Sequence, residues 1–237
     1  MVKKIVGTGV LLVLALALQA GVKMYTLKSP DGKVKLEVTA GQGIAYSLFY
    51  DGRLLLKPSR IALHTDLPEA DHWENIRITG TKQRHVSETV QAPFYRVKEF
   101  GIDCNELELR LNNGFSLLMR AYNDGMAYRF VAGRKGEMTV VEERAEFNFA
   151  DDFEAYIPYS TNPKDPWNMA FQNFYTKAPL TQYNTELPAF LPLTVDAGAV
   201  KLTLLESDLE AYPGMFVRGD GKTPALKGVF AAYPQET

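Results

Sequence analysis

Cysteine is the scarcest residue in this 237-residue chain, with Cys104 as its single copy. One cysteine excludes an internal disulfide and a cysteine-rich zinc site. Histidine is nearly as rare: His64, His72 and His85 are the three, and no two have the helical spacing of a zinc-binding pair. We expect all three histidines to be ordinary surface or half-buried residues.

The chain also lacks a basic excess. It has 26 Lys and Arg against 28 Asp and Glu, a formal net charge of −2. Nucleic-acid binding requires a basic surface, so this balance excludes it. No segment of about twelve or more residues has an apolar stripe at helical spacing, and we find neither a GxSxG elbow nor a phosphate-binding glycine loop.

The only long apolar run is at the N-terminus. Lys3 and Lys4 precede an apolar stretch over residues 10–18, and Gln19-Ala20 offers a cleavage point. This order predicts a secretory signal over residues 1–20, since the run is too short to span a bilayer; a retained membrane anchor is the alternative. We therefore expect an exported protein, periplasmic or secreted, with a mature domain over residues 21–237 and a charge of −4.

What the chain does have is short alternating segments between turn dipeptides. The turn signals are Asp31-Gly32, Asp51-Gly52, Asn113-Gly114, Asp124-Gly125 and Asp220-Gly221. Apolar residues alternate with polar ones over residues 34–38, 107–111 and 201–204. Segments 107–111, 117–121 and 128–131, joined by two short turns, predict a meander. Strands at this density without helices predict an antiparallel all-β sandwich.

Residues 153–190 interrupt this rhythm with nine aromatic residues and five prolines. Prolines at this spacing exclude a long helix or a central strand, so we expect a long loop. Trp167, Phe171, Phe174 and Tyr175 lie in it, and either they form a functional surface or they pack beneath the loop as a satellite core.

The acidic residues do not form a recognisable catalytic pair. Glu142 and Glu143 are adjacent on an expected strand and so point to opposite faces. Glu206, Asp208 and Glu210 lie near a strand end, where we expect them to be solvated. Residues 151–154 (DDFE) offer two or three oxygen ligands, too few for a complete calcium site, although a site shared with another domain is open.

An ordered series of segments carries a resemblance to a known family. They are SPDGK at 29–33, YSLFYDGRL at 46–54, SETVQAPF at 87–94, NEL at 105–107, RAYNDGMAYRF at 120–130, AYIP at 155–158, FYTKAPL at 174–180, LPLTV at 191–195 and LEAYPGM at 209–215. In this order they resemble the N-terminal domain of glycoside hydrolase family 97. The resemblance implies a β-supersandwich of the galactose-mutarotase-like type.

The resemblance also implies a function. Family members are exported α-glucosidases or α-galactosidases whose catalytic carboxylates lie in a (β/α)₈ barrel, which this chain does not contain. The chain alone is therefore expected to be inactive, to brace the barrel and to shape the pocket for an oligosaccharide. Residues 87–130 are more similar to the α-galactosidases, because Glu88-Thr89 is not followed by a tryptophan-rich stretch.

Site residues follow from the same resemblance. Trp167, Phe174 and Tyr175 are expected to face the barrel mouth and the sugar. Calcium is expected near the active site, with one ligand from this domain at the position of Gln172, or of Glu186 if the loop aligns differently. Because family N-terminal domains continue for more strands, the chain is expected to be a truncated product or a fragment.

Two rival interpretations assign this chain no part in a catalysed reaction. A stand-alone carbohydrate-binding module would use the aromatic residues of segment 153–190 as a stacking platform. A sandwich that only mediates contacts within a surface complex would not bind sugar through them. The resemblance favours the N-terminal domain of a glycosidase over both.

Overall fold

The computed structural model describes residues 22–168, 171–207, 209 and 212–232, and they form an all-β fold. The strands are β1 (Lys23–Lys28), β2 (Val34–Gly41), β3 (Gly43–Tyr50), β4 (Arg53–Thr65), β5 (Ile78–Gln91), β6 (Glu99–Leu111), β7 (Phe115–Tyr122), β8 (Gly125–Ala132), β9 (Val140–Asn148), β10 (Glu154–Ile157), β11 (Thr176–Pro179), β12 (Leu193–Asp196), β13 (Lys201–Leu204), β14 (Met215–Gly219) and β15 (Ala225–Phe230), with one 3₁₀ turn, η2 (Leu180–Gln182). These residues contain no α-helix, as the lack of helical stripes predicted.

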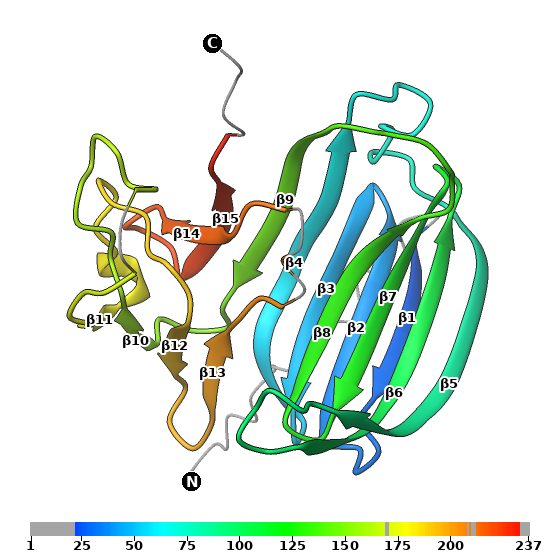
Figure 1. Ribbon diagram of the computed structural model, residues 1–237, viewed down its shortest axis with the longest axis horizontal. Coiled ribbons are helices and arrows are strands. Elements are labelled where there is room, and N and C mark those ends of the chain that lie inside the picture. The colour runs from blue at the N-terminus through cyan, green and yellow to red at the C-terminus, as the bar shows by residue number, and fades with distance from the viewer. Residues whose placement is uncertain (1–21, 169–170, 208, 210–211, 233–237) are drawn as a thin grey trace, which may run out of the picture.

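Three antiparallel sheets make up the fold. A seven-stranded sheet has the order β1-β2-β3-β4-β9-β15-β14, and two four-stranded sheets have the orders β5-β6-β7-β8 and β11-β10-β12-β13. The β5–β8 sheet lies over the β1–β4 half of the large sheet, and the third sheet lies to one side (Figure 1). The predicted antiparallel sandwich is thus confirmed, as is the meander, which is β6, β7 and β8.

The core lies between the two stacked sheets because each contributes one apolar face. Val34, Leu36 and Val38 on β2 are buried, whereas the residues between them are half-exposed. The same alternation buries every second residue of β7. Glycines with positive φ, Gly32 at 76° and Gly114 at 86°, make the tight turns that return the chain to the next strand.

The prediction of one long loop over residues 153–190 is wrong in part. Its start forms β10, and its later part contains β11, which pairs with β10; β10 also pairs with β12. Both strands have only four residues, so they show no periodicity in the sequence. The prolines fit this arrangement: Pro158 follows the last residue of β10, and Pro179 ends β11, which is an edge strand. The irregular part is residues 158–175.

The predicted leader, residues 1–20, lies outside the described residues. Nowhere in the described ranges is there a helix with the length and hydrophobicity needed to span a bilayer.

On the outer face of the β5–β8 sheet, a carboxylate is fixed across three strands. Glu106 on β6 is only 4% exposed, and its two oxygens accept hydrogen bonds from Arg84 Nε at 2.6 Å and Arg120 Nε at 2.8 Å. Burial alone would raise the pKa of Glu106, but the hydrogen bonds from the two arginines outweigh it and lower this pKa. Nearby on β6, Cys104 is fully buried, and its burial raises the pKa of the thiol.

We predict that Glu106→Ala lowers the free energy of unfolding by about 2 kcal/mol at pH 7, because two arginines lose their shared partner. Because the native pKa of Glu106 is below its ordinary value of 4.5, its stabilising effect is present above that pH and is lost as the pH falls through the native pKa. Urea unfolding of both proteins at pH 7 and pH 3 measures the difference.

Glu108→Ala is the matched control, two residues along the same strand. Glu108 pairs with Arg110, whose side chain is mostly exposed, so we expect a loss of no more than about 0.5 kcal/mol. Equal losses in the two variants would contradict a special role for Glu106.

Candidate functional site

The aromatic residues of segment 158–175 divide into a packed set and an exposed set. The Trp167 ring meets Phe216 of β14 edge-on with 4.9 Å between ring centroids. Phe171 lies 5.8 Å from both Phe216 and Phe190, measured in the same way. Phe190 and Phe216 are themselves buried. The underside of this segment is therefore the satellite core that the sequence offered as one of two alternatives.

The packed rings and a few hydrogen bonds fix the path of the segment. Asn173 Nδ2 donates to the Tyr159 carbonyl at 2.7 Å, and Asn173 Oδ1 accepts from the Phe174 amide at 2.8 Å. Phe171 has a φ of 53°, a left-handed conformation that a bulky residue adopts only when its surroundings impose it. Here the contacts of Phe171 with Phe190 and Phe216 hold it in place.

Phe174 and Tyr175 form the exposed set, together with one side of Phe171, which is 57% exposed despite its two ring contacts. Phe174 is 95% exposed and Tyr175 is 47% exposed. The Tyr175 hydroxyl donates to the Pro192 carbonyl at 3.2 Å, which ties its ring to the segment before β12. The structure thus places the three predicted sugar-binding residues on one segment, but Trp167 is half-buried while Phe174 projects into solvent. Their role in sugar binding stays a prediction.

The two predicted calcium ligands are exposed and lie on different segments. Gln172 is in the irregular segment, and Glu186 is in the turn that follows η2, where its amide donates to Asn184 Oδ1 at 3.1 Å. Together they offer an amide oxygen and a carboxylate, whereas calcium takes six to eight oxygens. The residues of this chain therefore do not fit a complete calcium site.

The other acidic patch considered for calcium already has protein partners. Asp152 accepts hydrogen bonds from the Thr181 amide at 2.9 Å and the Thr181 hydroxyl at 2.6 Å. Glu154 pairs with Lys177 at 2.7 Å. In the described ranges, no group of three or more His, Cys, Asp or Glu side chains is arranged to hold a metal. Like the histidines, of which His64 is half-buried and the others exposed, these groups belong to the surface.

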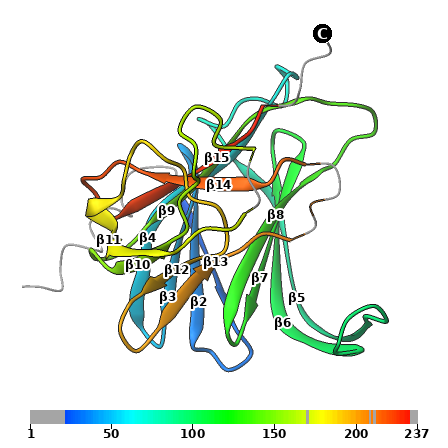
Figure 2. The ribbon, with the colours of Figure 1, turned by 60° about the vertical axis from the view of Figure 1, so that its left-hand side comes forward.

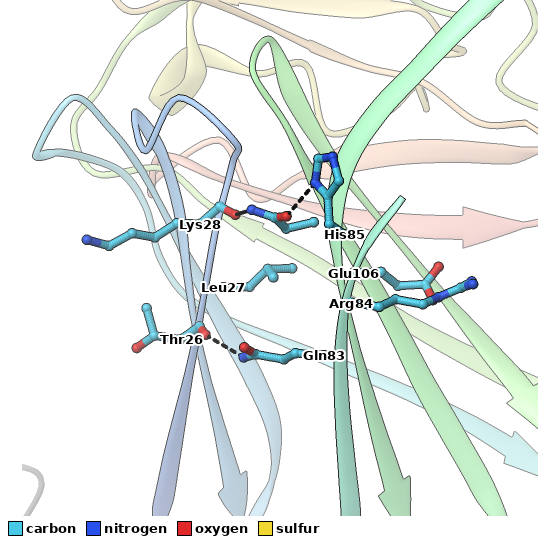
Figure 3. Close-up of a pocket in the computed structure, with 8 residues that line it drawn as sticks. Thr26, Leu27, Lys28, Gln83, Arg84, His85 and Glu106 are labelled. Atoms are coloured by element: carbon cyan, nitrogen blue, oxygen red, sulfur yellow. Dashed lines mark hydrogen bonds and ion pairs between the residues drawn. The ribbon is translucent and has the colours of Figure 1, made fainter. Parts of the chain in front are cut away.

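A solvent-open hollow of about 460 Å³ lies between the edge strand β1 and the β5–β6 hairpin. Figure 3 shows Gln83 reaching toward Thr26 of β1. Gln83 Nε2 donates to the Thr26 carbonyl at 3.1 Å, and Asn105 Nδ2 donates to the Lys28 carbonyl at 2.9 Å (Figure 3). These bonds satisfy backbone oxygens on the free edge of β1, so the polar lining of the hollow closes the margin of the sandwich.

At the opposite margin the structure forms an acid pair that the sequence did not reveal. Glu143 of β9 accepts a hydrogen bond from the Tyr212 hydroxyl at 2.7 Å, and Glu206 accepts one from the Met215 amide at 2.8 Å. Burial raises the pKa of both carboxyls, and the negative charge of Glu206 raises that of Glu143 further. Glu206 is thus half-buried rather than fully solvated as expected; Asp208 and Glu210 lie outside the described residues.

Glu143 and Glu206 lie on the same side of the molecule because of the path that the chain takes after β13. It brings Glu206 and Tyr212 to the side of β9 on which Glu143 points inward, while Glu142 on the other face is exposed, as its spacing predicted. Glu143 and Glu206 are 63 positions apart in the sequence, and no local pattern signals that they meet. Both are half-buried, and each already accepts a hydrogen bond from the protein, Glu143 from Tyr212 and Glu206 from the Met215 amide.

We predict that Glu143→Gln raises the melting temperature at pH 8 by about 2 °C. The native pKa of Glu143 is raised, so the folded protein holds its proton more tightly than the unfolded chain does, and stability falls as the pH rises from the ordinary value toward the native one. A neutral amide removes this loss and still accepts from Tyr212. Differential scanning calorimetry at pH 8 and pH 4 should show the gain at pH 8 alone.

The exposed Glu142→Gln is the control at the neighbouring position and should leave the melting temperature unchanged at both pH values. A stabilisation by Glu143→Gln that is the same at pH 4 would contradict an origin in the charge.

Comparison with solved structures finds proteins with a similar fold. A glycoside hydrolase family 97 enzyme from Pseudoalteromonas sp. strain K8, in complex with panose, superposes with a TM-score of 0.72 at 18% identity, over 87% of this chain and 32% of that one. A crystal structure of a beta-arabinopyranosidase superposes with a TM-score of 0.74 at 20% identity, over 88% and 35% respectively.

Sequence comparison gives a nearer relative. The retaining alpha-galactosidase of Bacteroides thetaiotaomicron is 39% identical over 229 residues, which are 94% of this chain and 34% of that protein. The chain thus spans about a third of the length of this relative. Residues 27–234 match the glycosyl-hydrolase 97 N-terminal family. The chain therefore belongs to the N-terminal domain family of the glycosyl-hydrolase 97 enzymes.

Proposed function

We propose that this chain serves as the non-catalytic N-terminal domain of an exported α-glycosidase, and that its substrate is an α-galactoside rather than an α-glucoside. Membership of the family, with 39% identity to a retaining alpha-galactosidase, supports this proposal. The domain braces a (β/α)₈ catalytic domain that supplies the carboxylates. The structural neighbours are below 25% identical and bear on the fold alone.

The observation that carries the proposal is the split between the packed and exposed rings of segment 158–175. Trp167 and Phe171 fix the segment on β14, and the Tyr175 hydroxyl is tied to the Pro192 carbonyl, so the rings of Phe174 and Tyr175 are held in a defined place while they stay exposed. Rings held in this way form a wall for a sugar or for a facing domain at low cost in conformational entropy. In the proposed enzyme, they form one side of the sugar pocket.

Calcium enters this proposal only as an ion bound jointly by this domain and the catalytic domain. Gln172 or Glu186 would give one oxygen ligand, and the catalytic domain would give the remainder. Because both side chains are exposed, either can reach a neighbouring domain. The ion would be close to the sugar, where its positive charge would orient oxygen ligands.

The alternative function is a stand-alone carbohydrate-binding module, and the exposure of Phe174 is what favours it. Sugar-binding modules use exposed aromatic rings as stacking platforms. Such a module would hold a sugar with this chain alone, whereas one wall of a pocket would not.

Isothermal titration of the purified chain with melibiose distinguishes the two functions. We expect no saturable binding up to millimolar sugar, because half a pocket leaves most of the sugar in water. A dissociation constant below about 1 mM would overturn the pocket-wall proposal and establish the binding module.

A chimera tests the pocket wall directly. In it, this chain replaces the matching third of the Bacteroides thetaiotaomicron retaining alpha-galactosidase. We expect Phe174→Ala to lower kcat/KM for a p-nitrophenyl α-galactoside by about tenfold, since a stacking contact is worth about 1.4 kcal/mol. Val141→Ala, which trims an exposed apolar residue of β9, is the control and should leave kcat/KM unchanged. Equal values for both variants would contradict a role for Phe174.

A further inference from the structure

β5 is a largely exposed strand, with Val86 as its single buried residue. β5 has 14 residues, against about five or six in an ordinary strand, and it is the edge of its sheet. It forms the right-hand boundary of the molecule in Figure 1. In the part of the chain that the structure describes, its backbone pairs with β6 alone, and no hydrogen bond reaches its outer edge. A long edge of this kind is a template for another strand.

The tip of the same hairpin is exposed and apolar. The exposed residues are Val90, Phe94, Tyr95, Val97 and Phe100, and Phe94 is 98% exposed. Figure 2 shows this tip extending away from the rest of the molecule. Large apolar side chains gathered within eleven positions mark a contact surface more often than a free one.

Hydrogen bonds within the tip hold these side chains in place. The Ala92 amide donates to the Lys98 carbonyl at 2.7 Å, and the Tyr95 amide donates to the Ala92 carbonyl at 3.0 Å. Gln91 Nε2 donates to Glu99 Oε1 at 2.9 Å. The tip therefore has a defined shape before any partner binds, which reduces the entropy lost on binding.

The charges of β5 are complementary to those of a second β5. If two copies of the strand run antiparallel with Val86 opposite Val86, each Arg84 faces the partner's Glu88, twice across the two-fold axis. Lys82 then faces the partner's Val90, and no two like charges are opposite each other. The tip of one copy then lies near the start of the other β5.

We propose that the outer edge of β5 is the interface of a symmetric homodimer, in which the two β5–β8 sheets join into one eight-stranded sheet. The outward backbone groups of β5 supply the hydrogen bonds. The Arg84–Glu88 pairs fix the register, and burial of the two tips against the partner adds apolar contact. This assembly is independent of the sugar-binding function proposed above, because segment 158–175 lies on the other side of the molecule (Figure 1).

Sedimentation-velocity centrifugation of the purified chain from 1 to 300 µM tests the assembly. We expect a concentration-dependent shift from monomer to dimer. A monomer throughout this range would overturn the proposal, and so would a tetramer or open-ended aggregate, because a two-fold edge pairing closes at two copies.

Two pairs of variants test the surface. Glu88→Arg places like charges opposite each other twice and should raise the dimer dissociation constant at least about tenfold. Glu142→Arg makes the same charge change on exposed β9 and should leave it unchanged. Phe94→Ser should weaken the dimer, whereas Phe174→Ser, at a residue of nearly equal exposure in segment 158–175, should not. Equal effects within either pair would contradict this interface.

Cross-linking tests the register. With Val86 central, Gln83 faces the partner's Thr89, whereas two copies of Gln83 are about 20 Å apart along the strands. Mixing Gln83→Cys chains with Thr89→Cys chains and oxidising the mixture should give a disulfide-linked dimer that neither variant forms alone. The native Cys104 does not interfere because it is buried. A dimer in which only like variants cross-link, or none do, would overturn the β5 pairing.

Discussion

The fold depends on burying one apolar face from each of two sheets against the other. β2 and β7 show this most simply, because alternate residues of both strands are buried between the sheets. Stacking removes these faces from water, which is the main favourable term in folding, but it leaves two long margins at which backbone and polar groups meet solvent. Gln83 and Asn105 bind the free carbonyls of β1 at one margin. Glu143 and Tyr212 close the other, where the chain crosses after β13.

Where the sequence has period two, its analysis predicts the structure well. Leu107, Leu109 and Leu111 alternate with polar residues, and they are buried in β6 as expected. It fails where elements are short or contacts are distant. β10 and β11 have four residues each beside prolines, so neither periodicity nor composition distinguishes them from loop. Glu143 and Glu206 meet only because of the route of the chain between sheets, which depends on tertiary packing rather than local preference.

In the aromatic segment too, the sequence predicts the general feature but not which residues form the candidate site. Its density of aromatic residues and prolines correctly marked a non-repetitive surface feature, and the family resemblance is confirmed. Which ring is packed and which is exposed depends on where Phe216 lies, and this residue comes from β14, which is remote in sequence. Trp167, the largest ring in the segment, packs on Phe216 and anchors the segment, whereas Phe174 is exposed on the surface. Size and composition alone therefore do not separate scaffold from site.

The solitary thiol of this chain has a practical consequence. Cys104 is fully inside, opposite Val86 in the β5–β6 ladder and beside Tyr122 of β7. A thiol reagent can reach it only when the side chains that cover it move aside, and burial raises the pKa of the thiol, which disfavours the reactive thiolate. The labelling rate of the native protein therefore reports how often this part of the β5–β8 sheet exposes Cys104, without an engineered cysteine. The single cysteine of the chain thus allows local opening at the β5–β6 hairpin to be measured by thiol labelling.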